Sequence, residues 1–263
     1  MRSLAFVAAL AFILTLPQAR AEEDEAARTK RWQDLAHLIF NGPQPTDLPG
    51  WITVDAPTRA MDAALVPVTL TVAENRRIKS LYLVVDENPS PVAAHILFGP
   101  AADPHMITMR IRVDQYTDLH AVVETTDGRL ISTARFIKAA GGCSAPGSEA
   151  PELALKSAGK MKLRITGQPS AARAELLVKH PNFNGMQMDQ VTRLYTPARY
   201  INSIEVAYNG QRVFHLDADI SMASDPAIGF GFKSDGTGTL SVQVEDTAHA
   251  TWHQDFPIQS HGT

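Results

Sequence analysis

Short segments in which apolar and polar residues alternate fill most of this chain after residue 65, and this two-residue period is its strongest constraint on fold. Such alternation places apolar side chains on one face of a β-strand and polar ones on the other. The segments fall into two series, separated by turn residues such as Asp127-Gly128 and Asn209-Gly210. The first series comprises residues 65–72, 78–85, 93–98, 106–113, 119–125 and 130–138; the second comprises 161–166, 174–178, 200–208, 212–220, 228–233, 239–245 and 251–258. Because no helical pattern separates the strands within a series, each is typical of an antiparallel sandwich of immunoglobulin-like type.

The segment between the two series has a different composition. Residues 141–160 are rich in Gly, Pro, Ser, Ala and charged residues, with only Leu153 and Leu155 as large apolar side chains before the next strand. This composition is typical of a linker. We therefore predict an all-β fold with two immunoglobulin-like β-sandwich domains, residues 30–140 and 161–263, joined by a flexible linker at 141–160 that contains the only cysteine of the chain.

The N-terminus has the pattern of a secretory signal peptide. A basic start is followed by an apolar run over residues 3–16 and by the small-x-small sequence Ala19-Arg20-Ala21. The run is shorter than the roughly 20 residues needed to cross a bilayer. We predict cleavage after residue 21 and a periplasmic protein without a membrane span. Losing Arg2 and Arg20 would leave 22 basic and 28 acidic side chains, so the formal net charge would change from −4 to −6.

An acidic chain without basic runs is a poor candidate for binding nucleic acid or anionic lipid, and we expect neither as a partner. After the predicted cleavage site, Trp32, Leu35, Ala36 and Ile39 fall on one helical face. This spacing predicts a short N-terminal helix that ends at Asn41-Gly42.

Cys143 is the candidate functional residue. Cysteines of exported proteins are usually paired, yet this chain has no second cysteine to pair with. Gly141-Gly142 before it and Ser144-Ala145 after it offer no apolar surroundings, so we expect an exposed, mobile thiol. Such a thiol suits a covalent carrier, in which one side chain takes up a group and presents it to partner enzymes. No histidine lies close in sequence to lower its pKa, so the partners would have to supply activation.

Several alternatives to the carrier remain open from the residues alone. In the first alternative Cys143 is an incidental surface cysteine, in the second it links two chains in a dimer, and in the third it is the nucleophile of an enzyme. In a further alternative the chain is an accessory binding module, and the thiol has no role.

Other residue groups carry weaker signals. His249 and His253 lie four apart on a predicted strand, with His215 as a third candidate metal ligand, but closed sites usually need three or four converging ligands, and we predict no metal. We interpret Asp217 and Asp219 as solvated residues on the outer face of a sandwich and not as an acid–base pair. The glycine pairs at 229/231 and 236/238 precede no helix, so we predict no phosphate loop and no cofactor.

Several short motifs occur together in a defined order. In the first half they are Ala56-Pro57, residues 62–69 (DAALVPVT), Asp86-Glu87-Asn88-Pro89, Pro91-Val92, Asp127-Gly128 and Gly141-Gly142-Cys143; in the second they are His180-Pro181 with Gly185, Asn209-Gly210 and Asp246. With these motifs the chain resembles the SoxY and SoxZ subunits of the bacterial sulfur-oxidation (thiosulfate) carrier, fused head to tail. It looks most like the fused carriers associated with quinoprotein dehydrogenases.

The resemblance implies a concrete role. It makes Cys143 the covalent carrier of sulfur intermediates and Gly141 and Gly142 its flexible arm, with no catalytic residues in the chain. It also implies, as partners, periplasmic sulfur-oxidation enzymes or a quinoprotein dehydrogenase system; on the alternative reading the chain is an accessory module of that dehydrogenase. The arm lies inside the chain here, whereas the family arm sits at a chain end.

Overall fold

A computed structural model describes residues 16–74, 76–147, 150–168, 171–189 and 192–258. The predicted signal peptide at 1–21 lies largely outside these residues. The chain divides into two compact units, residues 1–44 and 45–263. No helix in the described part of the chain combines the length and the apolar character that crossing a membrane requires.

The first unit contains helix α1, Leu16–Ile39, which includes the residues predicted to be helical. The helix ends as the sequence predicts. Asn41 and Gly42 adopt positive φ angles of 53° and 120°, and the Gly42 amide donates to the carbonyl oxygen of His37. Asparagine and glycine are the residues that most readily take this left-handed conformation at a helix end.

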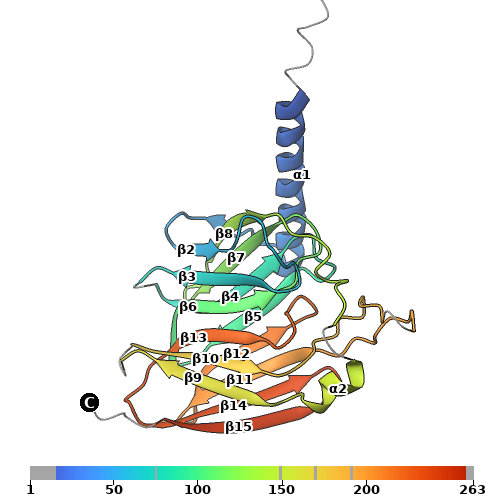
Figure 1. Ribbon diagram of the computed structural model, residues 1–263. Helices are drawn as coiled ribbons and strands as arrows, with labels where there is room; N and C mark the ends of the chain where they lie inside the picture. Colours follow the sequence, from blue (N-terminus) through green and yellow to red (C-terminus); the bar gives the residue numbers. More distant parts are fainter. Residues whose placement is uncertain (1–15, 75, 148–149, 169–170, 190–191, 259–263) are drawn as a thin grey trace, which may run out of the picture. The chain divides into compact units, whose positions relative to one another are not determined.

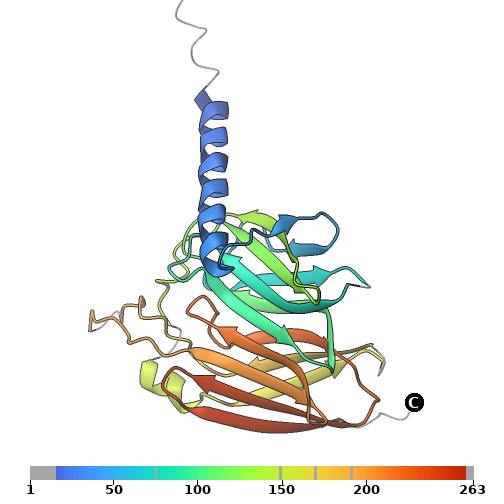
Figure 2. The ribbon, with the colours of Figure 1, turned by 180° about the vertical axis from the view of Figure 1, so that it is seen from behind.

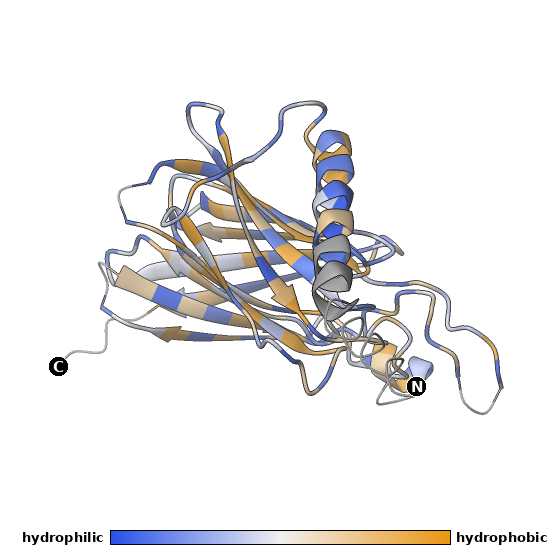
Figure 3. Cartoon of the chain, turned by 90° about the horizontal axis from the view of Figure 1, so that it is seen from above, coloured by the Kyte–Doolittle hydropathy of each residue, from blue (hydrophilic) through white to orange (hydrophobic). Residues whose placement is uncertain are grey.

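The second unit is built almost entirely of strands, which confirms the predicted all-β class (Figure 1). Its strands from the first half of the chain are β1 Thr46–Asp47, β2 Ile52–Asp55, β3 Val66–Val72, β4 Ile78–Val85, β5 Val92–Phe98, β6 Ala102–Ile111, β7 Thr117–Thr125 and β8 Leu130–Ile137. Those from the second half are β9 Met161–Thr166, β10 Ala172–Val178, β11 Ile201–Tyr208, β12 Gln211–Ala218, β13 Ala227–Phe232, β14 Gly238–Asp246 and β15 Thr251–Ile258. Hydrophobic and hydrophilic residues alternate along many of them (Figure 3).

The two halves share both of their sheets. One sheet has nine strands in the order β1-β8-β7-β4-β5-β12-β11-β14-β15, and the other has six in the order β2-β3-β6-β13-β10-β9. Antiparallel pairing of β5 with β12 and of β6 with β13 joins the halves, so each sheet runs through both of them (Figures 1 and 2). The alternation pattern identified the strands but carried no information about these pairings.

The residues of strand β13 explain how the two halves pair in the six-stranded sheet. Phe230 and Phe232 are buried, while Gly229 and Gly231 between and beside them lie against β6. A Cβ at Gly229 would lie 2.3 Å from Thr108 Oγ1, and one at Gly231 would lie 2.7 Å from the Asp103 carbonyl oxygen. These glycines therefore allow β13 to approach β6 closely, a packing role and not a phosphate-binding one.

The hairpin predicted at Asn209-Gly210 is confirmed. Both residues have positive φ, 48° and 78°, as a type I′ turn requires. The predicted linker, in contrast, is only partly irregular. It contains helix α2, Pro151–Lys156, which the composition did not indicate. Pro151 occupies the first turn, where a proline costs no intrahelical hydrogen bond.

Candidate functional site

Residues 141–147, which we call the cysteine arm, are hydrogen-bonded to residues 113 and 114, which follow the end of strand β6. The Gly141 amide donates to the Asp114 carbonyl oxygen at 2.8 Å, and the Gly142 amide donates to that of Val113 at 2.9 Å. Gly141 has a φ of +79°, which favours glycine. Gly142 has no room for a side chain, since a Cβ there would lie 2.0 Å from the Ala63 carbonyl oxygen. The two glycines therefore let the arm lie flat against its neighbours.

A long loop of the second half holds the other side of the arm. The Asn184 side-chain amide donates to the Cys143 carbonyl oxygen at 2.7 Å, and that of Gln187 donates to the Ala145 carbonyl oxygen at 3.1 Å. Both side chains are buried. The arm is thus hydrogen-bonded to both halves of the chain, and we call this arrangement the docked state.

The docked state contradicts one sequence-based expectation. Cys143 has no solvent exposure, so the prediction of an exposed, mobile thiol is wrong for this state. Its glycine-rich neighbours suggest exposure from the sequence, but in the structure they permit close packing. The residues that cover the arm lie far from it in sequence, and nothing in residues 141–147 indicates them.

Burial also changes the chemistry of the sulfur. It raises the pKa of the Cys143 thiol to about 11; the charge of Asp114 raises it further, and that of Arg112 opposes the increase. The thiolate is the nucleophilic form of cysteine. In the docked state Cys143 is therefore a protected, neutral thiol.

The raised pKa predicts how alkylation depends on pH. Docking stabilises the neutral thiol, so the docked arm is favoured below the ordinary pKa of 9.0 and weakens as the pH rises toward about 11. The rate of alkylation of Cys143 by iodoacetamide should therefore keep increasing up to about pH 11, whereas that of glutathione should level off near its own pKa. Quenched samples analysed by mass spectrometry measure both rates. Rapid alkylation near pH 6 would indicate an activated nucleophile and would contradict this expectation.

Arg112 is almost fully buried, with 2% of its surface exposed, and its positive charge lowers the pKa of the Cys143 thiol. Its Nη1 donates to the Met222 carbonyl oxygen at 2.6 Å and its Nη2 to that of Pro181 at 3.4 Å, both in the second half. Desolvation lowers the pKa of the guanidinium to about 10, while the charge of Cys143 raises it. The group stays protonated at neutral pH, so a buried positive charge acts on the thiol.

Asn88 anchors the same region. Its side-chain amide donates to the Arg112 carbonyl oxygen and to Ser221 Oγ, each at 2.8 Å, and its Oδ1 accepts from the Asp114 amide at 2.9 Å. Asn88 belongs to one of the motifs that carry the family resemblance. Asn88 thus connects residues 112–114, which precede strand β7 and include the residues bonded to the cysteine arm, to Ser221 in the second half of the chain.

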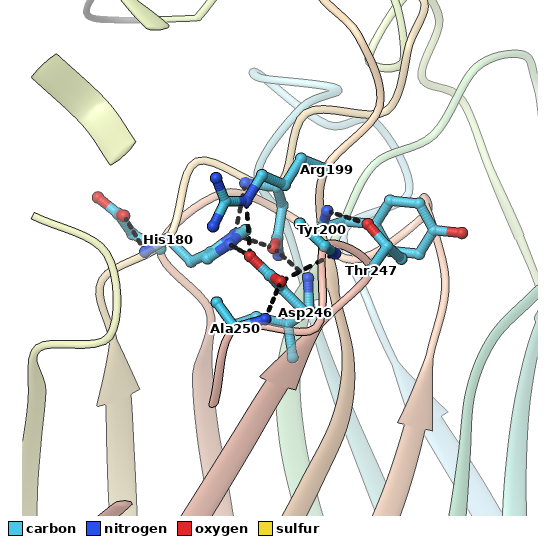
Figure 4. A network of polar contacts seen from close by, with 10 residues as sticks. His180, Arg199, Tyr200, Asp246, Thr247 and Ala250 are labelled. Atoms are coloured by element: carbon cyan, nitrogen blue, oxygen red, sulfur yellow. Dashed lines mark hydrogen bonds and ion pairs between the residues drawn. The ribbon is translucent and has the colours of Figure 1, made fainter. Parts of the chain in front are cut away.

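His180 fixes the start of the loop that covers the arm. It is fully buried, with Nδ1 2.7 Å from Asn182 Oδ1 and Nε2 3.4 Å from Asp246 Oδ2. Figure 4 shows Asp246 between His180 and Arg199, whose Nε donates to the same carboxylate at 2.7 Å. Burial would raise the pKa of Asp246, but hydrogen bonds from Arg199 and from the Ala250 amide hold it below its ordinary value.

Burial lowers the pKa of His180 more than the nearby Asp246 and Asn182 raise it. His180 is therefore neutral at neutral pH, and the network it forms with Asp246 is a structural support. It positions the loop that reaches Asn184, and Asn184 contacts Cys143.

The remaining candidates from the sequence lie apart from the cysteine arm. His215 contacts Glu205 and Asp217, His249 contacts Glu245, and His253 contacts Asp255. Asp219 accepts a hydrogen bond from Ser90 at 2.6 Å. Across the described ranges, no cluster of three or more His, Cys, Asp or Glu side chains has an arrangement that could hold a metal ion.

Two families match the chain one after the other. SoxY, described as "Sulfur oxidation protein SoxY", matches residues 38–143, and SoxZ, described as "Sulphur oxidation protein SoxZ", matches residues 161–257. Together the matches cover well over half of the chain. The chain is a fusion of SoxY and SoxZ domains. The SoxY match ends at Cys143, so the cysteine arm begins at the end of the SoxY domain, and the covering loop belongs to the SoxZ domain.

Solved structures include two that we compared with this SoxY–SoxZ fusion. The sulfur carrier protein SoxY from Chlorobium limicola f thiosulfatophilum has 23% identity and a TM-score of 0.38, over 44% of this chain and 98% of its own. A β-glycosidase from Bacteroides vulgatus has 9% identity and a TM-score of 0.25, over 79% of this chain and 24% of its own. A search among the curated proteins found no match.

Proposed function

We propose that this SoxY–SoxZ fusion is a non-catalytic carrier of the periplasm that holds a sulfur-containing intermediate covalently on Cys143 and presents it to sulfur-oxidation enzymes. One observation carries the proposal. The match to a sulfur-oxidation family ends on the only cysteine of the chain, at the start of a segment whose glycines permit large backbone changes. Neither family description names a quinoprotein dehydrogenase, so an association with one stays a prediction.

The docked state is one of two states that a carrier needs. In it the thiol is buried and neutral, which protects it from unwanted oxidation. Delivery requires a second state in which the arm has left this position and Cys143 enters a partner's active site. The contacts that hold the arm include two backbone hydrogen bonds and two hydrogen bonds from side-chain amides, each worth about 0.5–1.5 kcal/mol. Openings of this size occur locally without unfolding of the whole protein.

The length of the segment supports this movement. Residues 141–160 connect the two domains, and the 14 of these 20 residues that lie outside helix α2 (6 residues) would span roughly 45 Å at about 3.3 Å each when fully extended. Because the arm is attached at both ends, it would enter a partner as a doubled-back loop. A partner enzyme therefore needs a wider entrance than a free chain end would require.

Comparing two rates in the wild-type protein tests whether the arm opens. The first is the rate of Cys143 alkylation by a small reagent at neutral pH without denaturant, and the second is the rate of global unfolding extrapolated to the same conditions. We expect alkylation to be at least about ten times faster than unfolding, because local opening costs less than global unfolding. Equal rates would show that Cys143 becomes accessible only when the protein unfolds, and would contradict a carrier role.

A further inference from the structure

A cavity of about 370 Å³ lies at one end of the SoxY domain, where the segment before strand β2 meets the β3–β4 and β7–β8 turns. Most side chains of its lining are exposed, so the cavity is shallow and open to solvent. We call it the Trp51 site, and its lining consists of Trp51, Arg76, Arg77, Thr125, Thr126, Asp127 and Arg129.

Trp51 gives this site a fixed centre. Its side chain is half-buried and packs against the hydrophobic core. The guanidinium of Arg76 lies over the indole ring, 4.1 Å from the ring centroid, and that of Arg129 lies 5.1 Å from the same centroid. Cations are attracted to the face of an aromatic ring, so the indole orders two otherwise flexible side chains. Because this ordering precedes binding, less conformational entropy is lost when the arginines hold a ligand.

The charge of the Trp51 site is positive and only partly compensated. Three arginines and one aspartate give 3 − 1, a formal charge of +2, in a chain whose formal net charge is −4. Asp127 forms an ion pair with Arg129 at 2.9 Å. Arg76 and Arg77 form no ion pair with a carboxylate of the residues that the structure describes. Cations held together repel each other, so the site attracts anionic groups.

The chemistry of the site favours carboxylates that a protein segment presents. Guanidinium groups bind carboxylates through paired, charge-assisted hydrogen bonds. The arginines already contact the indole ring, which disfavours a ligand that would stack on Trp51. A small anion would keep much of its hydration in an open site, whereas small-ligand sites bury most of their ligand. Several carboxylates along one chain can instead reach all three arginines at once.

We infer that the Trp51 site docks an acidic segment of a partner protein, with Trp51 and its arginines as the central contacts. Tryptophan and arginine are among the residues that most often dominate the energy of protein interfaces. The inference does not require Cys143 to carry a load, and it therefore goes beyond the proposed function.

The Trp51 site lies far from the cysteine arm. Residues 113 and 114, which bond the arm, precede strand β7, and the last residue of that strand, Thr125, lines the site. This strand of 9 residues is roughly 30 Å long at about 3.4 Å per residue. A partner can therefore bind at the Trp51 site without covering the arm.

A hexaglutamate peptide tests the preference for acidic segments, and a hexaglutamine peptide of the same length is the neutral control. Binding of each fluorophore-labelled peptide to the wild-type protein is measured by fluorescence anisotropy at low ionic strength. We expect hexaglutamate to bind at least about ten-fold more tightly than hexaglutamine, and its affinity to fall as salt is added, because salt screens exposed charges. Equal binding of the two peptides would overturn the inference.

Substitutions in the site should change hexaglutamate binding in opposite directions. Arg76→Gln and Arg77→Gln should each weaken it about two- to five-fold, whereas Asp127→Asn removes a competing carboxylate and should strengthen it about two-fold. All three side chains are exposed, and Asn-Gly suits a turn as Asp-Gly does, so the fold should not change. Weaker binding by the Asp127→Asn protein would contradict the proposed role of the arginines.

Arg173→Gln is the matched control, because Arg173 is an exposed arginine of strand β10 outside the Trp51 site. It removes the same charge and should leave binding unchanged. If it weakens binding as much as Arg77→Gln does, the peptide responds only to the overall charge of the protein, and the inference is wrong.

Competition by salts identifies the kind of ligand. Sodium sulfate and sodium chloride, compared at equal ionic strength, should displace hexaglutamate to the same extent within about two-fold, since each acts only by screening. If sulfate displaces the peptide at about ten-fold lower ionic strength than chloride does, the site holds a small anion and the docking of a protein segment is refuted. None of these measurements involves Cys143, so their failure would leave the proposed carrier role intact.

Discussion

Replacing Cys143 with alanine or serine is expected to abolish the carrier function completely. Without the sulfur atom no covalent bond to a sulfur intermediate can form, so the loss does not depend on how the arm moves. The measurement is the amount of thiosulfate oxidised by host cells that do not make this protein themselves. These cells are made to express either the wild-type protein or a variant. Cells with the Cys143→Ala protein should oxidise no more thiosulfate than cells without the chain.

The two substitutions control for folding. Serine places a hydroxyl in a buried position and should cost about 1–3 kcal/mol, whereas alanine leaves no polar group there. Both proteins should unfold cooperatively when heated, and the alanine variant should be the more stable. Full sulfur oxidation by cells with a folded alanine variant would rule out Cys143 as the carrier and favour the accessory binding module.

Gly142→Ala is expected to release the arm from its docked position. The new Cβ would lie 2.0 Å from the backbone oxygen of Ala63, a distance that real structures do not contain, and the Ala63 oxygen belongs to backbone that cannot rotate away. Overpacking of this kind typically costs 1–3 kcal/mol, so the docked population should fall and alkylation of Cys143 should be about ten- to a hundred-fold faster than in the wild type. Mass spectrometry after timed exposure to iodoacetamide at neutral pH measures this.

A matched control separates arm release from general destabilisation. Gly128 also lies in a turn of the SoxY domain, has a positive φ and has open space around it, so Gly128→Ala introduces strain far from the arm. It should leave the alkylation rate of Cys143 unchanged. If Gly142→Ala lowers the unfolding temperature strongly without changing alkylation, then the arm is an integral part of the fold and not a movable segment.

The sequence predicted the strands well because alternation is a local property. The segments 78–85 and 161–166 were predicted with the boundaries that the structure has. It did not predict that both sheets continue from one half of the chain to the other. The pairing of β5 with β12 joins Phe98 to Phe214, residues more than 100 positions apart, and no local pattern encodes such a partner.

The candidate site was predicted in part for the same reason. Counting cysteines identified Cys143, and its neighbours identified the arm, but the burial of the thiol depends on Ala63, Asn184 and Gln187 in distant segments. Arg112 was missed because it occupies a polar position of an alternating strand, like the exposed Arg110 two residues earlier. Only the contact with the SoxZ domain distinguishes the buried arginine from the solvated one.

The mass of the arm peptide from native protein tests the central claim most directly. The protein is isolated from the periplasm of cells that are oxidising thiosulfate, without reductant, and the peptide containing Cys143 is analysed by mass spectrometry. We predict that part of this peptide carries added sulfur atoms or a sulfur-linked sulfonate, that reduction removes the addition, and that no other peptide carries it. A peptide with only the free thiol under these conditions would contradict the account.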